Sequence, residues 1–189
     1  MAETTDIDPF SVAVALTAAL ASRGVPYALG GAMAFGAWAE TRGTKDVDVN
    51  VFVEPEQLDP VFEALESLGA KFDRARAVAD ATGGGMFAAW VDWVRIDVFT
   101  PSIPFSWDAS RTRVEAEFKG RPVWFLSAEA ICVFKLLFFR SKDLVDLERL
   151  VAVQRGKLDT AYVRRHMVEM MGDDDERVKK WDALVAEFG

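Results

Sequence analysis

Two aspartates stand two positions apart inside a run of valines at residues 46–53. Side chains two apart on a strand point to the same face, so Asp46 and Asp48 share one face and the valines take the other. The two carboxylates repel each other and are costly to desolvate, and a bound cation offsets both effects. Oxygen ligands without a nearby histidine suit Mg²⁺ (or Mn²⁺) better than Zn²⁺.

A second strand is predicted at residues 91–99, which are rich in strong strand formers. Asp97 shares a face of this strand with Arg95 and Trp93, whereas Asp92 is expected in a turn. If this strand lies beside the first, Asp97 converges with the two earlier aspartates. Three acids on neighbouring strands can hold one or two metal ions against a triphosphate and an attacking hydroxyl.

A glycine pair precedes the first aspartates. Residues 27–29 read as a short strand, Gly30-Gly31 as a turn, and residues 31–39 as a helix. The free N–H groups at the start of that helix are suited to phosphate oxygens. The triple glycine at residues 83–85 precedes a strand rather than a helix, so it is predicted to be a turn and not a phosphate loop.

One lysine interrupts an otherwise apolar helix. Lys135 lies within the predicted helix at residues 127–139, which is apolar on all sides and therefore expected to be buried. A buried lysine needs an anion, and a nucleoside triphosphate or an aspartate would serve. The alternative is a lysine that snorkels to the surface. Asp146, on the helix predicted at residues 142–154, points partly inward and would pair with Lys135, position an acceptor or hold a metal.

The string Gly30-Gly31, then Arg-Gly-Thr-Lys-Asp-Val-Asp at residues 42–48, then Ile-Asp-Val at residues 96–98 resembles the nucleotidyltransferase superfamily related to DNA polymerase beta. Within it, the chain looks most like the AbiEii-type branch, whose second signature is a lysine on an apolar helix followed by a basic residue, Lys-Asp and another Asp. Here that signature comprises Lys135, Arg140, Lys142, Asp143 and Asp146. The superfamily often has Gly-Ser where this chain has Gly30-Gly31. The compact Lys–Asp segment leaves Asp143 and Asp146 as alternatives for the functional acid.

The resemblance implies transfer of a nucleoside monophosphate from a nucleoside triphosphate to a hydroxyl. The expected metal ligands are Asp46, Asp48 and Asp97. The same three aspartates, together with Lys135 and Asp146, are the expected catalytic residues. The residues expected to bind the nucleotide are Gly30, Gly31, Arg42, Thr44, Lys45 and Lys135. Asp97 would also serve as the base for the acceptor. The resemblance further suggests an RNA or tRNA end as acceptor, a toxin role and a cognate antitoxin. Alternatives are a small-molecule acceptor, as in antibiotic-modifying relatives, and a catalytically silent interaction protein.

The composition indicates a soluble intracellular domain without a membrane partner. The chain has 189 residues, a net charge of −8, one cysteine and one histidine. A lone cysteine cannot form an internal disulfide and fits the cytoplasm, and a lone histidine argues against histidine triads and zinc clusters. Residues 135–165 contain eight basic and four acidic side chains. They would either receive RNA phosphates or form solvated helix faces.

The predicted fold class is α/β (α+β): a nucleotidyltransferase-type mixed sheet flanked by helices, followed by a C-terminal helical region. The division falls at residues 1–126 for the core and 127–189 for the helical region. Further helices are expected at residues 8–22, 56–68, 160–171 and 175–188; further strands at residues 71–79, 86–91, 114–118 and 122–125.

Overall fold

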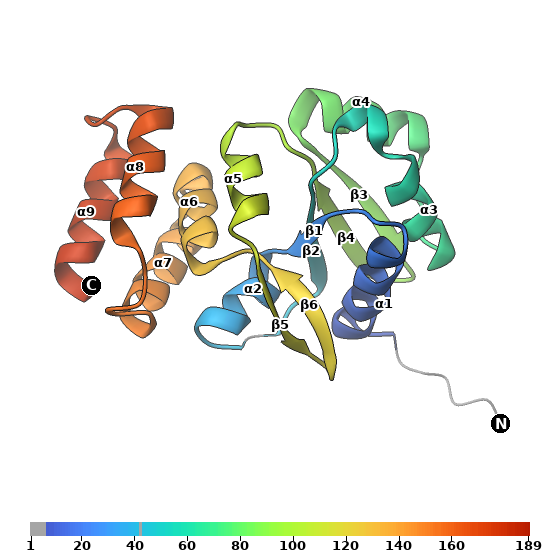
Figure 1. The fold of residues 1–189 in the computed structure, drawn as a ribbon, viewed down its shortest axis with the longest axis horizontal. Helices are drawn as coiled ribbons and strands as arrows, with labels where there is room; N and C mark the ends of the chain where they lie inside the picture. The colour runs from blue at the N-terminus through green and yellow to red at the C-terminus, as the bar shows by residue number, and fades with distance from the viewer. Residues whose placement is uncertain (1–6, 42) are drawn as a thin grey trace.

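A computed structural model describes residues 7–41 and 43–189 and shows a six-stranded mixed sheet with helices on both faces (Figure 1). The strands are β1 (Tyr27–Leu29), β2 (Asp46–Val51), β3 (Met86–Val91), β4 (Val94–Phe99), β5 (Val114–Phe118) and β6 (Arg121–Phe125). Their order across the sheet is β3-β4-β2-β1-β6-β5. Strand β2 runs parallel to β4 and antiparallel to β1, and β1 runs parallel to β6. The predicted mixed sheet is confirmed.

Helices precede, separate and follow the strands in the described residues. They are α1 (Pro9–Ser22), α2 (Gly31–Trp38), α3 (Asp59–Ser67), α4 (Arg74–Gly84), α5 (Phe105–Arg111), α6 (Ala128–Phe138), α7 (Ser141–Val153), α8 (Thr160–Met171) and α9 (Glu176–Phe188), with a short 3₁₀ turn at Pro55–Gln57. None of them is both long enough and apolar enough to cross a membrane. Helix α1 begins as its sequence predicts, because the Asp8 carboxylate accepts hydrogen bonds from the backbone N–H groups of Phe10 and Ser11 and Pro9 occupies the first turn.

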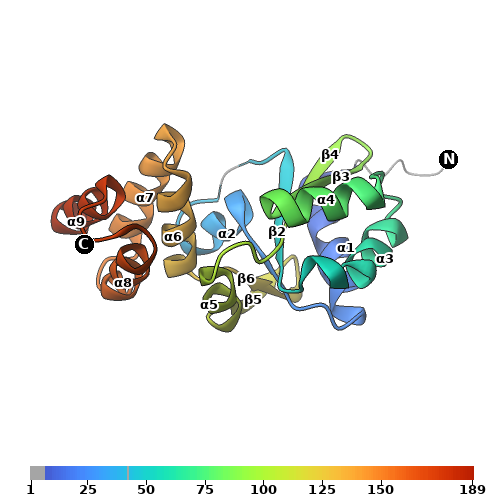
Figure 2. The ribbon, with the colours of Figure 1, turned by 90° about the horizontal axis from the view of Figure 1, so that it is seen from above.

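The alternation in β2 decides which face of the sheet is covered by which helices. Val47, Val49 and Val51 are fully buried, whereas Asp46 and Asp48 are only partly buried. Helices α1, α3 and α4 lie on one side of the sheet, and α2 and α6 lie on the other (Figure 2). The valines pack with the first group, which leaves the aspartates on the side of α2 and α6.

The four C-terminal helices α6–α9 gather at one end of the molecule (Figures 1 and 2). Two hydrogen bonds of Trp38, at the end of α2, lie where this end meets the sheet. The indole N–H of Trp38 donates to the carbonyl of Leu126 (2.7 Å), and the side-chain amide of Gln154 donates to the carbonyl of Trp38. These bonds fix the helical region against the layer that carries the aspartates. Whether residues 1–126 and 127–189 act as separate domains stays a prediction.

Two sequence-based expectations for secondary structure were wrong, and one helix was missed. Residues 71–79 do not form a strand: only Lys71 pairs, in an isolated bridge to Trp90, after which Asp73 caps helix α4. The Asp73 carboxylate accepts from the backbone N–H of Arg76 at 2.7 Å, and the following alanines favour helix. Two of the three glycines at residues 83–85 belong to that helix, and the third ends it. Helix α5 was not anticipated.

Candidate functional site

The parallel pairing of β2 and β4 brings the three predicted carboxylates onto one face of the sheet. Asp48 is the register partner of Asp97, and Asp46 is the register partner of Arg95. Residues that face each other across two strands point to the same side of the sheet. Asp46, Asp48, Asp97 and Arg95 thus occupy four adjacent positions, three of them acidic. The predicted adjacency of the two acid-bearing strands is confirmed.

The glycine pair lies directly against these acids. Gly31 has a φ of 51°, in the left-handed region, and a Cβ added there would overlap the carboxylate of Asp48. The backbone N–H of Gly30 donates to the carbonyl of Asp48 (2.8 Å). Gly30 caps α2 without a side-chain hydrogen bond, so the helix begins with open N–H groups beside Asp48. Glycine at residue 31 is what allows this close approach.

Asp48 is a largely buried carboxylate with two further carboxylates beside it. Burial, together with the neighbouring carboxylates of Asp46 and Asp97, raises the pKa of Asp48 to about 6; Lys142 and Lys135 oppose the rise. A site that holds its carboxylates at a raised pKa favours a cation among them. Hard carboxylate oxygens without histidine or cysteine fit Mg²⁺ or Mn²⁺.

Asp97 faces a positive charge of its own strand. The Nε and Nη2 atoms of Arg95 both lie 2.8 Å from Oδ1 of Asp97, whose side chain is 14% exposed. Burial raises the pKa of Asp97 and Arg95 works against that rise. Within residues 7–41 and 43–189, no three acidic, histidine or cysteine side chains already stand in an arrangement that could hold a metal ion. The metal role of the three acids therefore stays a prediction.

Residues before β2 hold Asp46 in place. The hydroxyl of Thr44 donates to the Asp46 carboxylate and lies 3.1 Å from the Asp46 carbonyl oxygen. Thr44 thus orients an acid, and its contact with phosphate stays a prediction, as does that of the neighbouring Lys45. Arg42, the remaining nucleotide-binding prediction of this segment, lies outside the described residues.

Lys135 is buried, as its apolar helix predicts, and contacts two aspartates of α7. Its Nζ lies 2.6 Å from Oδ2 of Asp146 and 3.4 Å from Oδ1 of Asp143, and it sits 5.7 Å from the centre of the Phe35 ring. Only 11% of the lysine side chain is exposed. Both candidate acids of the second signature thus form ion pairs with Lys135, and Asp146 is the nearer of the two. The structure contains no snorkelling lysine here.

Asp143 joins this cluster to Arg140. The Arg140 Nε donates to Oδ2 of Asp143 (2.6 Å), and the Arg140 backbone N–H donates to the same oxygen (3.2 Å). Burial alone would raise the pKa of Asp143, but the hydrogen bonds from Arg140 and the charge of Lys135 outweigh it and hold the pKa below its usual range. Two cations and two anions therefore compensate one another.

Lys142 is a functional candidate that the sequence reasoning did not single out. It is exposed near the start of α7, and it is the first of the lysines whose charge lowers the pKa of Asp48. Its position in the second signature could have suggested a role, but its approach to β2 depends on how α7 packs against α2. An exposed lysine facing a buried acidic site is well placed for a triphosphate.

The basic character of residues 135–165 is partly neutralised within the fold. Arg164 contacts Asp173 (2.8 Å) and Asp182 (2.9 Å), and Lys180 of α9 lies 3.6 Å from Glu148 of α7. The sequence allowed two interpretations of this segment, RNA binding or solvated helix faces, and these ion pairs favour the second. They lie on the outer helices rather than beside the carboxylates.

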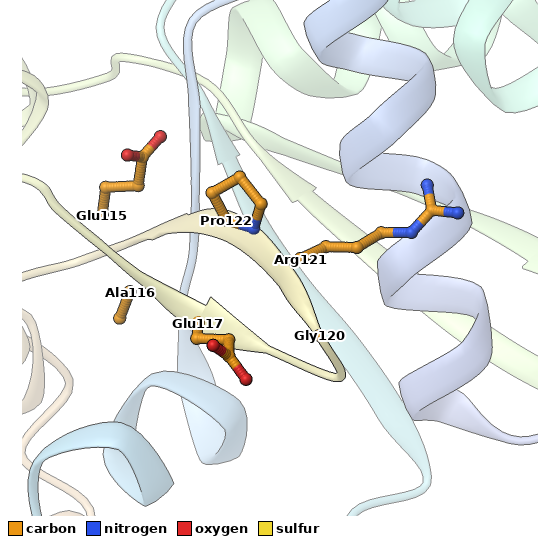
Figure 3. Close-up of a pocket in the computed structure, with 6 residues that line it drawn as sticks. All are labelled: Glu115, Ala116, Glu117, Gly120, Arg121 and Pro122. Atoms are coloured by element: carbon orange, nitrogen blue, oxygen red, sulfur yellow. The ribbon is translucent and has the colours of Figure 1, made fainter.

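A hollow elsewhere on the sheet is distinct from this site. It is lined by Glu115, Ala116, Glu117, Gly120, Arg121 and Pro122 of the β5–β6 hairpin (Figure 3). Strands β1 and β6 separate β5 from β2 in the sheet order. The hairpin hollow therefore does not include the carboxylates.

Solved structures with the same overall fold include an antibiotic-resistance factor and a nucleotidyltransferase-like protein. The solution structure of the antibiotic-resistance factor ANT(2'')-Ia superposes with a TM-score of 0.52 and 19% identity over 95% of this chain and 90% of that chain. The crystal structure of ANT(2'')-Ia in complex with adenylyl-2''-tobramycin gives 0.51 and 18%, over 95% of each chain. An antigenic nucleotidyltransferase-like protein from Paracoccidioides brasiliensis gives 0.51 and 16%, over 92% of this chain and 93% of that chain.

No protein-family model and no curated protein sequence matches the chain. At these identities the likeness concerns the fold. The likeness extends over nearly the full length of this chain and of each solved structure, so it includes the C-terminal helices. The chain thus has a nucleotidyltransferase-type fold.

Proposed function

We propose that the protein is a Mg²⁺-dependent nucleotidyltransferase that moves a nucleoside monophosphate from a nucleoside triphosphate to an acceptor hydroxyl. One observation carries the proposal: Asp48 lies between its register partner Asp97 and the open amino end of α2 at Gly31. Metal-binding oxygens and phosphate-binding N–H groups thereby meet at one point. The nucleotidyltransferase fold of the solved structures supports this reading.

Asp46, Asp48 and Asp97 would hold Mg²⁺, which supplies positive charge that offsets both the carboxylates and the triphosphate. The first N–H groups of α2 bind phosphate oxygens there, and the flexible, exposed Lys142 reaches them from α7. Lys135 keeps its expected part in neutralising phosphate charge, while its contact with Asp146 fixes its position. Asp97 accepts the proton of the attacking hydroxyl once its oxygen is released from Arg95.

Two classes of acceptor remain in the proposal. The resemblance of the sequence to AbiEii-type proteins supports an RNA or tRNA end, together with a toxin role, an antitoxin partner and a cytoplasmic location. A small-molecule acceptor is the second candidate, and two observations favour it. The matching ANT(2'')-Ia structure holds adenylyl-2''-tobramycin, and Arg164 of the basic segment is already paired with two aspartates.

The direct test incubates the protein with each labelled nucleoside triphosphate, Mg²⁺ and either total RNA or a set of aminoglycosides. We expect label on one acceptor class and release of pyrophosphate, both lost in Asp48→Asn. Asp80→Asn removes an acid from the exposed surface of α4 and is the matched control. Absence of transfer by the wild type with every triphosphate and acceptor would contradict the proposal.

A charge reversal separates the acceptors. Arg164→Glu combined with Arg165→Glu should weaken RNA modification and its steep salt dependence, because each lost phosphate contact lowers the slope of log affinity against log salt by about 0.7 to 0.9. A small-molecule acceptor predicts a shallow salt dependence and no effect of the double reversal.

A further inference from the structure

We propose that Arg95 is the resident counter-ion of Asp97 and is displaced when the metal binds, so that this arginine sets the metal concentration at which the site fills. The inference rests on the proposed function, because it assumes that the three acids bind a divalent cation. It assigns Arg95 a positioning role: it controls which way Asp97 points and does not itself touch the reacting atoms.

The contact geometry makes Arg95 and a metal ion alternatives. Two guanidinium nitrogens lie 2.8 Å from a single oxygen, Oδ1 of Asp97. That carboxylate stands in register with Asp48, where a cation shared between β2 and β4 would need it. The two N–H donors engage both lone pairs of that oxygen, so a metal ion that takes Oδ1 must displace at least one of them.

The arginine also has somewhere to go. Its side chain is 50% exposed, so part of it already lies in solvent. The indole of Trp90, its register partner on β3, lies 5.9 Å from the guanidinium carbon and is itself 43% exposed. A guanidinium that leaves Asp97 can remain over this ring. The exchange raises the local positive charge by one, because a divalent cation enters as a single positive charge withdraws, and this offsets the three carboxylates further.

The test measures metal binding by the rise in melting temperature with Mg²⁺ or Mn²⁺ alone. Arg95→Met should lower the half-saturating metal concentration by about two- to fivefold, the range expected for loss of a half-exposed ion pair. Arg95→Lys keeps a positive charge within reach of Asp97 and should stay close to the wild type. Lys71→Met removes the same charge from an exposed position whose backbone pairs with Trp90, and it should leave metal binding unchanged.

A second readout follows the arginine itself. Metal binding to the wild type should change the indole emission of Trp90, and the change should disappear in Trp90→Phe and shrink in Arg95→Met. This measurement needs no turnover and does not depend on the affinity of the Arg95→Met variant.

The outcomes separate this inference from the proposed function. No response of the wild type to either metal would overturn both. A wild-type response that Arg95→Met shares unchanged, or that Arg95→Met weakens, would overturn the role of Arg95 and leave the metal site standing. An equal gain in Lys71→Met would show that net charge alone is responsible. A metal-induced change in indole emission that is undiminished in Trp90→Phe would contradict the displacement of Arg95 toward Trp90.

Discussion

Two charged clusters lie on the side of the sheet that α2 and α6 cover, and they differ in how their charges are balanced. The cluster of α6 and α7 pairs Lys135 and Arg140 with Asp143 and Asp146 at 2.6 to 3.4 Å. The cluster of β2 and β4 contains three acids and one arginine, and burial raises the pKa of Asp48 to about 6. Within residues 7–41 and 43–189, the first cluster balances its charges, whereas the second contains more negative than positive charge.

This difference indicates where a ligand belongs. A compensated buried cluster contributes a fixed architecture, and removing one partner strands the other. An uncompensated cluster lowers stability until a cation arrives, which is a recognised mark of a functional site. Charge-changing substitutions should therefore act on binding and chemistry in the β2–β4 cluster, and on folding in the cluster of Lys135, Arg140, Asp143 and Asp146.

The largest effect is expected at Asp48. Asp48→Asn removes a proposed metal ligand and should lower nucleotidyl transfer by about 1000-fold, the scale of losing charge stabilisation or general base catalysis. The same variant should melt at a higher temperature than the wild type without metal, because it relieves repulsion with Asp46 and Asp97. Kinetic assays and thermal melts check both. A variant that is less stable and equally active would erase the contrast between the clusters.

The compensated cluster should show the opposite behaviour. Asp146→Ala leaves the buried Lys135 with only the more distant Asp143, and we expect a loss of about 3 kcal/mol in the free energy of unfolding. Replacing the pair together, as Lys135→Met with Asp146→Leu, should recover much of this loss because no buried charge remains unpaired. Chemical denaturation measures both variants. A cost below about 1 kcal/mol for Asp146→Ala would show that the cluster is not compensated as described.

The pH dependence of stability distinguishes the two clusters without an activity assay. Asp48 has a folded pKa of about 6, above its unfolded value near 4, so the folded state binds the proton more tightly. Its contribution is favourable below pH 4 and is lost as the pH rises to 6, by up to about 3 kcal/mol. Asp143, with its lowered pKa, instead loses its contribution on acidification. Metal-free melts of the wild type and Asp48→Asn should diverge between pH 4 and 6; parallel curves would contradict the raised pKa.

The smallest effect separates the two lysines. Lys142→Met should keep the fold, because the side chain is exposed, and should weaken triphosphate binding about tenfold through loss of one charged hydrogen bond. Lys135→Met should lower the melting temperature more and the triphosphate affinity less, since two aspartates already hold this lysine. Calorimetric titration of a non-hydrolysable triphosphate compares them. The reverse ranking would make Lys135, rather than Lys142, the main contact of the phosphates.

The parts of the site carried by short, strongly patterned segments could be predicted from the sequence. The alternation around Asp46 and Asp48 fixes a strand face, and the apolar surroundings of Lys135 predict its burial. The partner of Lys135 could not be chosen from sequence, because Asp143 and Asp146 lie one helical turn apart on α7. Their shared contact emerges only from the crossing of α6 and α7.

The misses have the same physical origin. Small and charged residues alternate after Lys71 and imitate a strand, but a cap at Asp73 starts a helix instead. The proximity of Lys142 to Asp48 requires the docking of α7 on α2, which no local pattern encodes. The contact of Arg95 with Asp97 is local in sequence. Its proposed role in metal binding, however, depends on Asp48 of β2 being the register partner of Asp97.

The parallel pairing of β2 with β4 also bears on the order in which the chain folds. The β3–β4 hairpin turns at Asp92, whose φ of 53° suits a tight turn, so its contacts are close in sequence and form early. Asp48 and Asp97 meet only when that hairpin docks on β2, after α3 and α4 have bridged the long crossover. Closing such a loop is slow compared with forming a hairpin. The mutual repulsion of the acids therefore arises near the end of folding, when the valine face of the sheet is already gaining its cover.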